Sequence, residues 1–348
     1  MAATASQAKG VSVADDGQVF DFTIIGAGPT GLFAAFYAGL RQMSTKVIEA
    51  LPEPGGQLAV LYPEKMIYDV PGHPKILAQD LVKLLIEQCE RFMPAYVYDE
   101  RIDTLTRTTV DGEEVWRLGT ATRPHLSRTV LISAGIGAFA PTKIDRPHIA
   151  EYEGRGIFYF VKDKRPFRGQ RILIVGGGDT AVDWCLNLKD WASQITLIHR
   201  RDQFRAHEGS LAALRATGIP IHTFHELKRV DGDGRVQQAT IFDNRTGEEK
   251  TLDIDAVLIN IGFKAALGPI ESWGLELADN RHIRVDGFME TNLKGVFAAG
   301  DIAAVEGSEP LNLIVTGFGQ AAIAANAAKR AVDPKSRLFP GHSSELKL

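Results

Sequence analysis

The amino-acid sequence predicts an α/β protein of two doubly wound units, the second inserted into the first. Two glycine-rich turns, at residues 26–31 and 176–181, each follow a β-rich run and precede an apolar helical segment. After residue 290, a further β-rich run and a long alanine-rich helix return to the pattern of the first unit. A chain of 348 residues is long enough for two domains of roughly 150 residues each.

Composition excludes several classes of protein. Apolar residues make up 45% and charged residues 24% of the chain, an ordinary globular balance. The net charge of −4 argues against broad binding of nucleic acid, and no apolar stretch approaches the roughly 18 residues of a membrane span. Two cysteines, Cys89 and Cys185, are too few for a disulfide scaffold and form no C-x-x-C pair. The nine histidines show no metal-ligand spacing, so we expect no metal.

The two chain ends are predicted to extend from the folded units. Residues 1–18 are small and polar and lack the roughly 7–15 consecutive apolar residues of a secretory signal. We therefore expect a flexible N-terminal tail and a cytoplasmic protein. Residues 336–348 follow the alanine-rich helix and are mostly polar, which by composition alone is typical of a frayed end.

The first unit opens with a predicted buried strand at 19–25, followed at once by Gly26, Gly28 and Gly31 in a G-x-G-x-x-G turn. In this motif the first glycine permits the tight turn, the second lets the backbone approach a pyrophosphate, and the third allows the helix to pack closely on the strand. The helix predicted at 32–40 would direct its N-terminal N–H groups and positive dipole at the anion. A glycine turn alone can be purely structural.

The residue at the tip of the next strand indicates which ribose is bound. The strand predicted at 46–49 ends in Glu49, 23 residues after Gly26. A carboxylate at this distance accepts hydrogen bonds from the hydroxyls of an unphosphorylated ribose. The full succession of strand, turn, helix, strand and acid favours a dinucleotide site over a structural turn.

The same succession of elements recurs 150 residues later. A second phosphate-binding turn is therefore predicted, again at the N-terminus of a helix. The elements are a strand at 171–175, the turn Gly176-Gly-Gly178-Asp179-Thr180-Ala181, a helix at 181–188 and a strand at 195–199.

Arginines replace the acid at the tip of this second strand. Arg200 stands 24 residues after Gly176 and is followed by Arg201 and, about one helical turn on, by Arg205. A carboxylate would repel a ribose 2′-phosphate, whereas a guanidinium binds it through two parallel charge-assisted hydrogen bonds. The second unit is thus predicted to select NADP(H), and the contrast favours FAD in the first. The alternative is a solvated basic face without a ligand.

The chain returns to the first unit through a predicted strand that ends in Asp301. A carboxylate there can accept a hydroxyl of the flavin ribityl chain; alternatively it caps the next helix. That helix, predicted from Thr316 to about residue 332, would stabilise negative charge on a reduced flavin through its N-terminal dipole. We therefore predict four parts: a tail at 1–18, an FAD-binding domain at 19–145 and 291–335, an NADP(H)-binding domain at 146–290, and a C-terminal extension at 336–348.

With these motifs, the chain resembles the low-molecular-weight pyridine-nucleotide disulfide oxidoreductase family over residues 20–348. The runs His199-Arg-Arg-Asp-Gln-Phe-Arg205 and Gly295-Val-Phe-Ala-Ala-Gly-Asp301 are similar to those of thioredoxin reductases. Those enzymes carry a C-x-x-C pair just ahead of the second glycine turn, where this sequence has Tyr159-Phe-Val-Lys162. Without its own dithiol, the protein is not expected to reduce a protein disulfide.

The run from Gly55 to Gly72 and the tail at His342 resemble the thioredoxin-reductase-like class of ferredoxin–NADP reductases. This resemblance implies two Rossmann-like domains, the NADP domain inserted into the FAD domain, and a homodimer. It also implies that Tyr62 stacks on one face of the flavin and that His342, or alternatively Phe339, covers the other. Tyr62 as an ordinary core residue is the other possibility. With the first glycine turn, the implied FAD contacts are Gly26, Gly28, Thr30, Gly31, Glu49, Gln57, Tyr62, Ile102, Phe139, Asp301 and Ser344. The NADP(H) contacts are Gly176, Gly178, Asp179, Thr180, Ala181, His199, Arg200, Arg201 and Arg205.

The resemblance implies an FAD-dependent ferredoxin–NADP(+) reductase. NADPH would deliver a hydride to the flavin, which would pass single electrons to ferredoxin or flavodoxin, with no catalytic residue required beyond the flavin. An NADPH-dependent flavin oxidoreductase that serves a quinone or another acceptor is the alternative. A redox-responsive binding protein that keeps FAD without turnover is a third possibility.

A basic docking patch is expected despite the negative net charge, because ferredoxins are usually acidic. The candidate residues cluster just ahead of the second glycine turn and could alternatively form a solvated loop. They are Lys162, Lys164, Arg165, Arg168 and Arg171.

Overall fold

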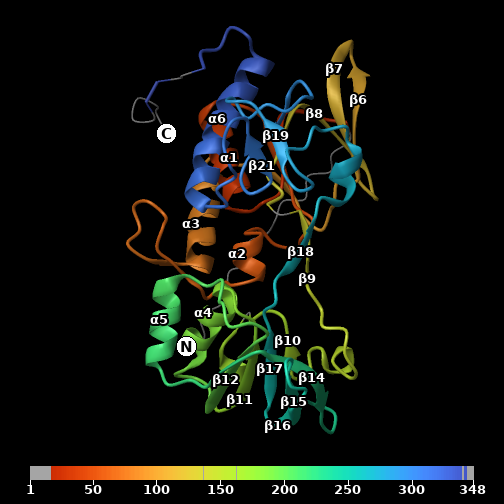
Figure 1. The fold of residues 1–348 in the computed structure, drawn as a ribbon. Coiled ribbons are helices and arrows are strands. Elements are labelled where there is room, and N and C mark those ends of the chain that lie inside the picture. Colours follow the sequence, from red (N-terminus) through yellow and green to blue (C-terminus); the bar gives the residue numbers. More distant parts are fainter. Residues whose placement is uncertain (1–16, 136, 162, 339–340, 343–348) are drawn as a thin grey trace, which may run out of the picture. The chain divides into compact units, whose positions relative to one another are not determined.

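The protein forms two compact units in a computed structural model that describes residues 17–135, 137–161, 163–338 and 341–342. The first unit contains the described residues up to 138 and from 265 onward, and the second contains residues 139–264. The chain crosses between them through β9 (Ala138–Pro141) and β18 (Phe263–Ala266), which pair with each other (Figure 1). The predicted α/β class, with one unit inserted into the other, is confirmed.

A parallel sheet forms the centre of the first unit. Its strands follow the order β5–β2–β1–β8, and the second edge of β8 pairs with antiparallel β7 near its start and with parallel β20 near its end. This order is that of a doubly wound sheet, in which ligands bind beyond the carboxyl ends of the central strands. The strands are β1 (Val19–Ile25), β2 (Thr45–Ile48), β5 (Ala95–Val97), β6 (Thr104–Val110), β7 (Glu113–Gly119), β8 (Pro124–Ile132) and β20 (Val296–Ala298).

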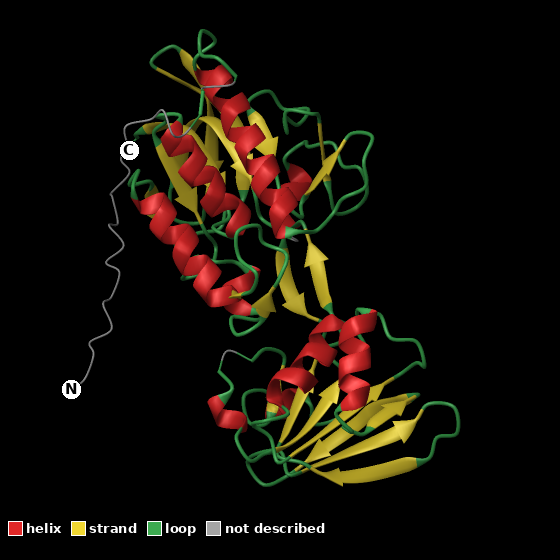
Figure 2. Cartoon of the chain, turned by 90° about the vertical axis from the view of Figure 1, so that its left-hand side faces the viewer, coloured by secondary structure: helices red, strands yellow, loops and turns green. Residues whose placement is uncertain are grey.

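Three helices of the first unit lie side by side, α1 (Pro29–Leu40) between α3 (Ala78–Glu90) and α6 (Ile314–Val332) (Figures 1 and 2). α1 and α6 pack against each other, with the ring centres of Phe33 and Phe318 5.0 Å apart. Both helices contain small, fully buried residues, namely Ala34, Ala38, Ala321 and Ala325. α1 begins three residues before the predicted start, since Pro29 is accepted in a first helical turn. Within the described ranges, no helix is long and apolar enough to cross a bilayer.

The smaller elements of the first unit include a segment that the sequence assigned to the other domain. Residues 265–290 pack into the first core through Leu267, Ile270 and Trp273, and the Trp273 indole donates a hydrogen bond to the Asp103 carbonyl at 3.1 Å. The domain boundary therefore lies near residue 264 rather than 290, and the second unit begins at 139 rather than 146. These elements are α2 (Gln57–Val60), β3 (Met66–Ile67), β4 (Ile76–Leu77), η3 (Gly268–Ser272), β19 (Ile283–Val285) and β21 (Ala303–Val305).

The second unit repeats the doubly wound order in a five-stranded parallel sheet, β10–β17–β11–β12–β13, with a separate antiparallel sheet, β14–β15–β16. Its strands are β10 (Ile157–Phe158), β11 (Arg171–Val175), β12 (Gln194–His199), β13 (Ile221–Thr223), β14 (His225–Asp231), β15 (Gln238–Asp243), β16 (Glu249–Asp253) and β17 (Ala256–Ile259). Its helices are α4 (Asp179–Leu188), α5 (Glu208–Ala216) and the short η1 (Ala150–Tyr152) and η2 (Arg165–Phe167).

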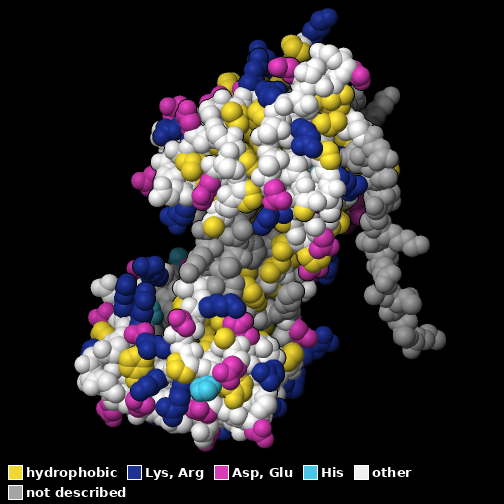
Figure 3. Space-filling view, turned by 90° about the vertical axis from the view of Figure 1, so that its right-hand side faces the viewer, with side chains coloured by type: hydrophobic (Ala, Val, Ile, Leu, Met, Phe, Trp, Pro, Cys, Tyr) yellow, Lys and Arg dark blue, Asp and Glu magenta, His cyan; other side chains and the backbone are white. Residues whose placement is uncertain are grey.

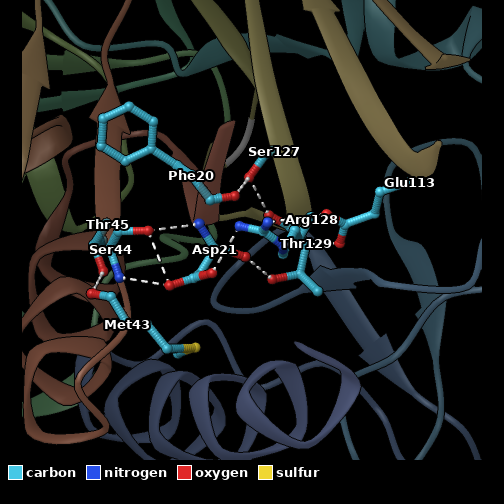
Figure 4. A network of polar contacts seen from close by, with 9 residues as sticks. All are labelled: Phe20, Asp21, Met43, Ser44, Thr45, Glu113, Ser127, Arg128 and Thr129. Atoms are coloured by element: carbon cyan, nitrogen blue, oxygen red, sulfur yellow. Dashed lines mark hydrogen bonds and ion pairs between the residues drawn. The ribbon is translucent and has the colours of Figure 1, made fainter. Parts of the chain in front are cut away.

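A polar network fixes β1 near the end opposite its glycine turn. The Asp21 carboxylate accepts hydrogen bonds from the N–H and hydroxyl of Ser44, both at 2.9 Å, and pairs with Arg128 at 3.1 Å (Figure 4). The same guanidinium pairs with Glu113 on β7 at 2.8 Å. One arginine of β8 thus ties β1 to β7, which holds the register of the sheet that carries the first turn.

A second polar cluster is buried in the same sheet. Lys46 is 1% exposed, its ammonium lies 3.4 Å from Nδ1 of His125 and 4.1 Å from the centre of the Phe20 ring, and His125 in turn lies 3.4 Å from Glu100. Burial lowers the pKa of Lys46 to about 8, with a further contribution from the charge of Arg123. Burial likewise lowers the pKa of His125 to about 4, so this imidazole is neutral near pH 7.

This cluster predicts a pH-dependent stability. The pKa of Lys46 is near 8 in the folded protein and 10.5 in its unperturbed state, so between these values the unfolded chain binds more protons and the free energy of unfolding rises with pH. The cost of burying the charge is fully present below about pH 8 and is relieved as the pH rises toward 10.5. Between pH 8 and pH 10.5, the free energy of unfolding of wild type should therefore rise by on the order of 2 kcal/mol relative to that of the Lys46→Met variant.

Urea unfolding at a series of pH values measures this gain. Lys83→Met is the control, because Lys83 is 70% exposed and its ion pair with Asp80 lies on the surface. It should give a profile parallel to wild type. A parallel profile for Lys46→Met would mean that Lys46 titrates as an ordinary surface lysine.

Candidate functional site

The glycine turn of the first unit follows β1 and leads into α1. Gly26 has a φ of +103°, and a Cβ atom there would lie 2.6 Å from the Ser133 carbonyl oxygen. At Gly31 a Cβ atom would lie 1.9 Å from the carbonyl oxygen of Gly26. A Cβ atom at Gly28, by contrast, would meet nothing within 4 Å. The outer two glycines are therefore needed for packing, whereas Gly28 leaves open space in front of the backbone.

Glu49 lies beside this turn, where the sequence predicts it. Its two carboxylate oxygens accept hydrogen bonds from the N–H groups of Ala27 at 2.7 Å and Leu51 at 3.0 Å. Burial raises the pKa of Glu49, and these N–H donors oppose the shift. The Ala50 N–H is a third backbone donor to this carboxylate. A carboxylate has about four acceptor positions, so Glu49 is held in place and remains able to accept a hydroxyl.

A second group of polar side chains meets beyond the end of β20. The Gln57 amide donates to Asp301 at 3.4 Å, and the charge of Asp301 acts on Tyr62. Burial raises the pKa of Tyr62 to about 12, with a smaller contribution from Asp301. Burial also raises the pKa of Asp301, against the Gln57 hydrogen bond. Three residues predicted separately along the sequence are thus neighbours.

The N-terminal turn of α6 meets α1 at the same place. A Cβ atom at Gly317 would lie 2.3 Å from the Thr30 hydroxyl, and one at Gly300 would lie 2.9 Å from it. The Gly300 N–H donates to the side chain of Gln320 at 2.7 Å. The sequence analysis did not include Gln320 among the site residues. Its position one helical turn after Thr316 indicates that it lies near the start of the same helix. α1, α6 and the end of β20 therefore converge on one region of the first unit.

The second unit carries a matching turn between β11 and α4. A Cβ atom at Gly176 would lie 2.2 Å from the Asn260 carbonyl oxygen, whereas one at Gly178 would meet nothing within 4 Å. Ala181, in the third position, is fully buried. The side-chain oxygen of Asn260, another residue that escaped prediction, is buried and has no hydrogen-bond partner among the described residues. An unpaired buried acceptor at this strand end is a feature that a bound ligand can satisfy.

The arginine loop after β12, residues 199–205, is anchored to this turn through its backbone. The N–H of Arg205 donates to the Gly177 carbonyl at 2.7 Å, and the His199 ring fills the space that a Cβ atom at Gly177 would occupy. Burial lowers the pKa of His199, and the neighbouring arginines add to the shift. Arg200, Arg201 and Arg205 are exposed and have no carboxylate partner in the described part of the chain. Three guanidinium groups are thus available to an anion.

Both turns fit a dinucleotide pyrophosphate. α1 and α4 each begin at a glycine N-cap, Gly28 and Gly178, and neither helix receives a side-chain cap hydrogen bond. The first N–H groups of a helix need acceptors, and a phosphate is a good one. Asp179, in the first turn of α4, accepts the His207 N–H at 2.8 Å, so its carboxylate serves the protein backbone.

A sequence model of one protein family covers both turns. The model of the pyridine nucleotide-disulphide oxidoreductases matches residues 20–330. The chain belongs to this family. Among proteins of known structure, the thioredoxin reductase of Lactococcus lactis is 28% identical, with a TM-score of 0.75, over 90% of this chain and 99% of its own. That of T. acidophilum, at 23% identity and a TM-score of 0.75, shares the fold.

Curated relatives of this pyridine nucleotide-disulphide oxidoreductase are more similar in sequence. A protein named ferredoxin–NADP reductase from Symbiobacterium thermophilum is 53% identical over 94% of this chain and 97% of its own length. Another of that name from Thermus thermophilus is 51% identical over 93% of this chain and 96% of its own length. The resemblance inferred from the motifs is thereby confirmed.

The cysteines of this family member do not form a redox pair. Cys89 lies in α3 of the first unit and Cys185 in α4 of the second, and both are free and buried. The Cys89 thiol donates to the Leu32 carbonyl at 2.7 Å. Burial raises the pKa of both thiols to about 12, so neither is a thiolate near neutral pH.

The predicted docking patch is partly neutralised within this oxidoreductase. Arg165 pairs with Asp163 at 2.7 Å, and Arg171 pairs with Asp255 at 3.0 Å. The Arg168 guanidinium lies 4.7 Å from the centre of the Trp191 ring, and Lys162 lies outside the described residues. Figure 3 shows Lys and Arg side chains among Asp and Glu side chains on the face it draws. The patch stays a prediction with two of its charges compensated locally.

The remaining predicted flavin contacts are Ile102, Phe139, Ser344 and either His342 or Phe339. Ile102 is buried in the first core, His342 is exposed, the Phe139 side chain is not described, and Phe339 and Ser344 lie outside the described residues. The segment that leads to the C-terminus is anchored by the buried Arg41. Its guanidinium donates to the carbonyls of Arg337 at 2.7 Å and Leu338 at 3.2 Å, and to the Asn326 side chain.

Proposed function

We propose that the protein is an FAD-dependent ferredoxin–NADP(+) reductase, which exchanges a hydride with NADP(H) and single electrons with ferredoxin. The observation that carries this proposal is that both glycine turns have the geometry of a nucleotide site, whereas the two thiols are buried in different units. This arrangement disfavours a route through sulfur and supports two nucleotide sites. The names of relatives at about 50% identity support the same reaction.

The first unit would hold FAD. The N-terminus of α1 and the open backbone at Gly28 would bind the pyrophosphate, Glu49 a ribose, and Asp301 a ribityl hydroxyl. Tyr62 would stack on the ring, and the N-terminal dipole of α6 would stabilise negative charge there. When bound, FAD supplies the ability to take up two electrons at once and to release them singly.

The second unit would hold NADP(H). Gly178 and the uncapped N-terminus of α4 would bind its pyrophosphate, and Arg200, Arg201 and Arg205 its 2′-phosphate. No carboxylate pairs with these arginines in the described ranges, so binding requires no internal ion pair to break. The chain's own residues bind and orient the nucleotide, and none of them is required to move a proton.

The protein would be a cytoplasmic homodimer that binds ferredoxin. The family resemblance supports the dimer, and flavodoxin would be a second single-electron acceptor. An acidic partner requires local positive charge, for which Arg168 of the predicted patch is a candidate. Charge reversal of Arg168 should raise the Michaelis constant for ferredoxin and weaken its salt dependence.

A stopped-flow experiment tests the proposed reaction. The purified protein is reduced with NADPH and mixed with oxidised ferredoxin, and absorbance is followed at the flavin band. We expect bleaching by NADPH and rapid recovery with ferredoxin, faster than with a quinone or oxygen at equal concentration. Preference for the quinone would make the protein a flavin oxidoreductase of another acceptor. A protein that is colourless, or that NADPH does not bleach, would overturn the proposal.

Removal of both thiols should leave the reaction intact. The double variant Cys89→Ala and Cys185→Ala keeps every residue assigned to a nucleotide, so we expect NADPH oxidation with ferredoxin to stay within about twofold of wild type. Steady-state rates before and after treatment with an alkylating agent measure this directly. Loss of activity in a variant that retains its melting temperature would implicate a thiol in electron transfer.

A further inference from the structure

The turn between β15 and β16, residues 243–248, lies against the arginine loop. The side-chain nitrogen of Asn244 donates hydrogen bonds to the main-chain carbonyl of Arg200 at 3.0 Å and to the carboxylate of Glu226 at 3.0 Å. Both partners are acceptors only, so the amide nitrogen and not its oxygen faces them. An amide NH₂ has two hydrogens, and both are used here.

Asn244 joins three segments that are distant in sequence. Arg200 follows β12, Glu226 lies in β14, and Asn244 follows β15. The main-chain N–H of Asn244 also donates to the Phe224 carbonyl at 2.8 Å. One residue of the antiparallel sheet is thus bonded to the tip of the parallel sheet where the predicted 2′-phosphate contacts begin.

The turn that carries Asn244 is itself well held. The Asp243 carboxylate accepts the main-chain N–H of Arg245 and its guanidinium, both at 2.8 Å, and the same guanidinium lies 3.9 Å from the centre of the Phe224 ring. Phe224 has a φ of +59°, a conformation that a bulky residue adopts only where its surroundings enforce it. The Asn244 amide is therefore presented from a fixed support.

We propose that Asn244 is a positioning residue for recognition of the ribose 2′-phosphate, an inference that rests on the proposed function. Its amide fixes the backbone from which the Arg200 side chain projects. It also occupies an oxygen of Glu226 on β14, which lowers the capacity of that carboxylate to pair with Arg200 in place of the phosphate. Loss of the amide removes both effects, and each loss lowers the affinity for a 2′-phosphate.

Titration calorimetry on the full-length protein tests this without turnover. The probes are 2′,5′-ADP, which carries the 2′-phosphate, and 5′-AMP, which lacks it. For Asn244→Ala we expect the dissociation constant of 2′,5′-ADP to rise by about three- to tenfold, as for the loss of one or two hydrogen bonds, with that of 5′-AMP unchanged. The Asn244→Asp side chain has nearly the same shape but lacks the N–H donors. This variant should weaken the binding of 2′,5′-ADP at least as much as Asn244→Ala does.

Thr246→Ala is the matched control, because Thr246 lies in the same turn and its hydroxyl accepts the Glu248 N–H, its one side-chain hydrogen bond to a described residue. It should match wild type with both ligands. In steady state, Asn244→Ala should raise KM for NADPH while kcat at saturation is kept. An unchanged ratio of the two affinities, or an equal loss for both ligands, would overturn the proposal. If wild type itself fails to distinguish the two ligands, the assignment of the arginines to NADP(H) is wrong, a separate failure.

Discussion

Replacement of both Arg200 and Arg201 by alanine is expected to lower kcat/KM for NADPH by about 100-fold, with kcat/KM for NADH nearly unchanged. A hydrogen bond to a charged group contributes roughly 1.5–3 kcal/mol, and about 1.4 kcal/mol corresponds to a factor of ten. Because both side chains are exposed, we take the lower end for each. The measurement is the ratio of the two kcat/KM values, which cancels any general loss of activity.

The control for this prediction is Arg215→Ala. Arg215 is exposed in the last turn of α5, so its removal takes one positive charge from the same unit without touching the arginine loop. It should leave the NADPH to NADH ratio as in wild type. If the Arg200 and Arg201 variant also kept that ratio, the 2′-phosphate would be recognised by other residues.

The second large effect is expected at the first glycine turn, where two single substitutions should behave differently. Gly31→Ala would place a Cβ atom 1.9 Å from the Gly26 carbonyl oxygen, so we expect a loss of stability of at least about 2 kcal/mol even without FAD. Gly28→Ala has free space for its methyl group and a φ of −70°, so the FAD-free protein should melt close to wild type. Its affinity for FAD should fall on the order of 10–100-fold, because the methyl group would occupy the space of the pyrophosphate.

Thermal unfolding of the FAD-free forms and fluorescence titration with FAD separate these two effects. Gly287→Ala serves as the control, since Gly287 is exposed in the same unit and a Cβ atom there meets nothing within 4 Å. Wild-type affinity for FAD in Gly28→Ala would show that the cofactor does not approach this backbone, and the first unit would need another ligand.

The nucleotide turns could be predicted because residues that are close together in the sequence determine their geometry. Glycines at 26 and 31 are required by contacts with the neighbouring strand and turn, and the acid or arginine that follows lies at a fixed distance along the same βαβ unit. The proximity of Gln57, Tyr62 and Asp301 came from a resemblance to known sequences, since no local rule links residues 244 positions apart.

Features that depend on distant partners escaped prediction. Arg171 is compensated by Asp255, 84 residues later, so a basic cluster in the sequence is not a basic cluster on the surface. The predicted bounds of 146 and 290 differ from those of the compact units because residues 265–290 carry a mixed pattern, and only packing of Trp273 and its neighbours shows which core they join. Asn244 lacked any signal, since an asparagine in a polar turn is common.

The discontinuous first unit has a consequence during translation. β8 ends at Ile132, but its partner β20 and the helix α6 that covers α1 are complete only when residue 332 has been made, about 200 residues later. At 5–20 residues per second the ribosome needs roughly 10–40 s for this interval. The inserted unit is one continuous stretch of chain and can fold first. Until β20 and α6 are made, the N-terminal part of the first unit exposes the edge of β8 and an apolar face of α1. That half is where a chaperone would act on this polypeptide.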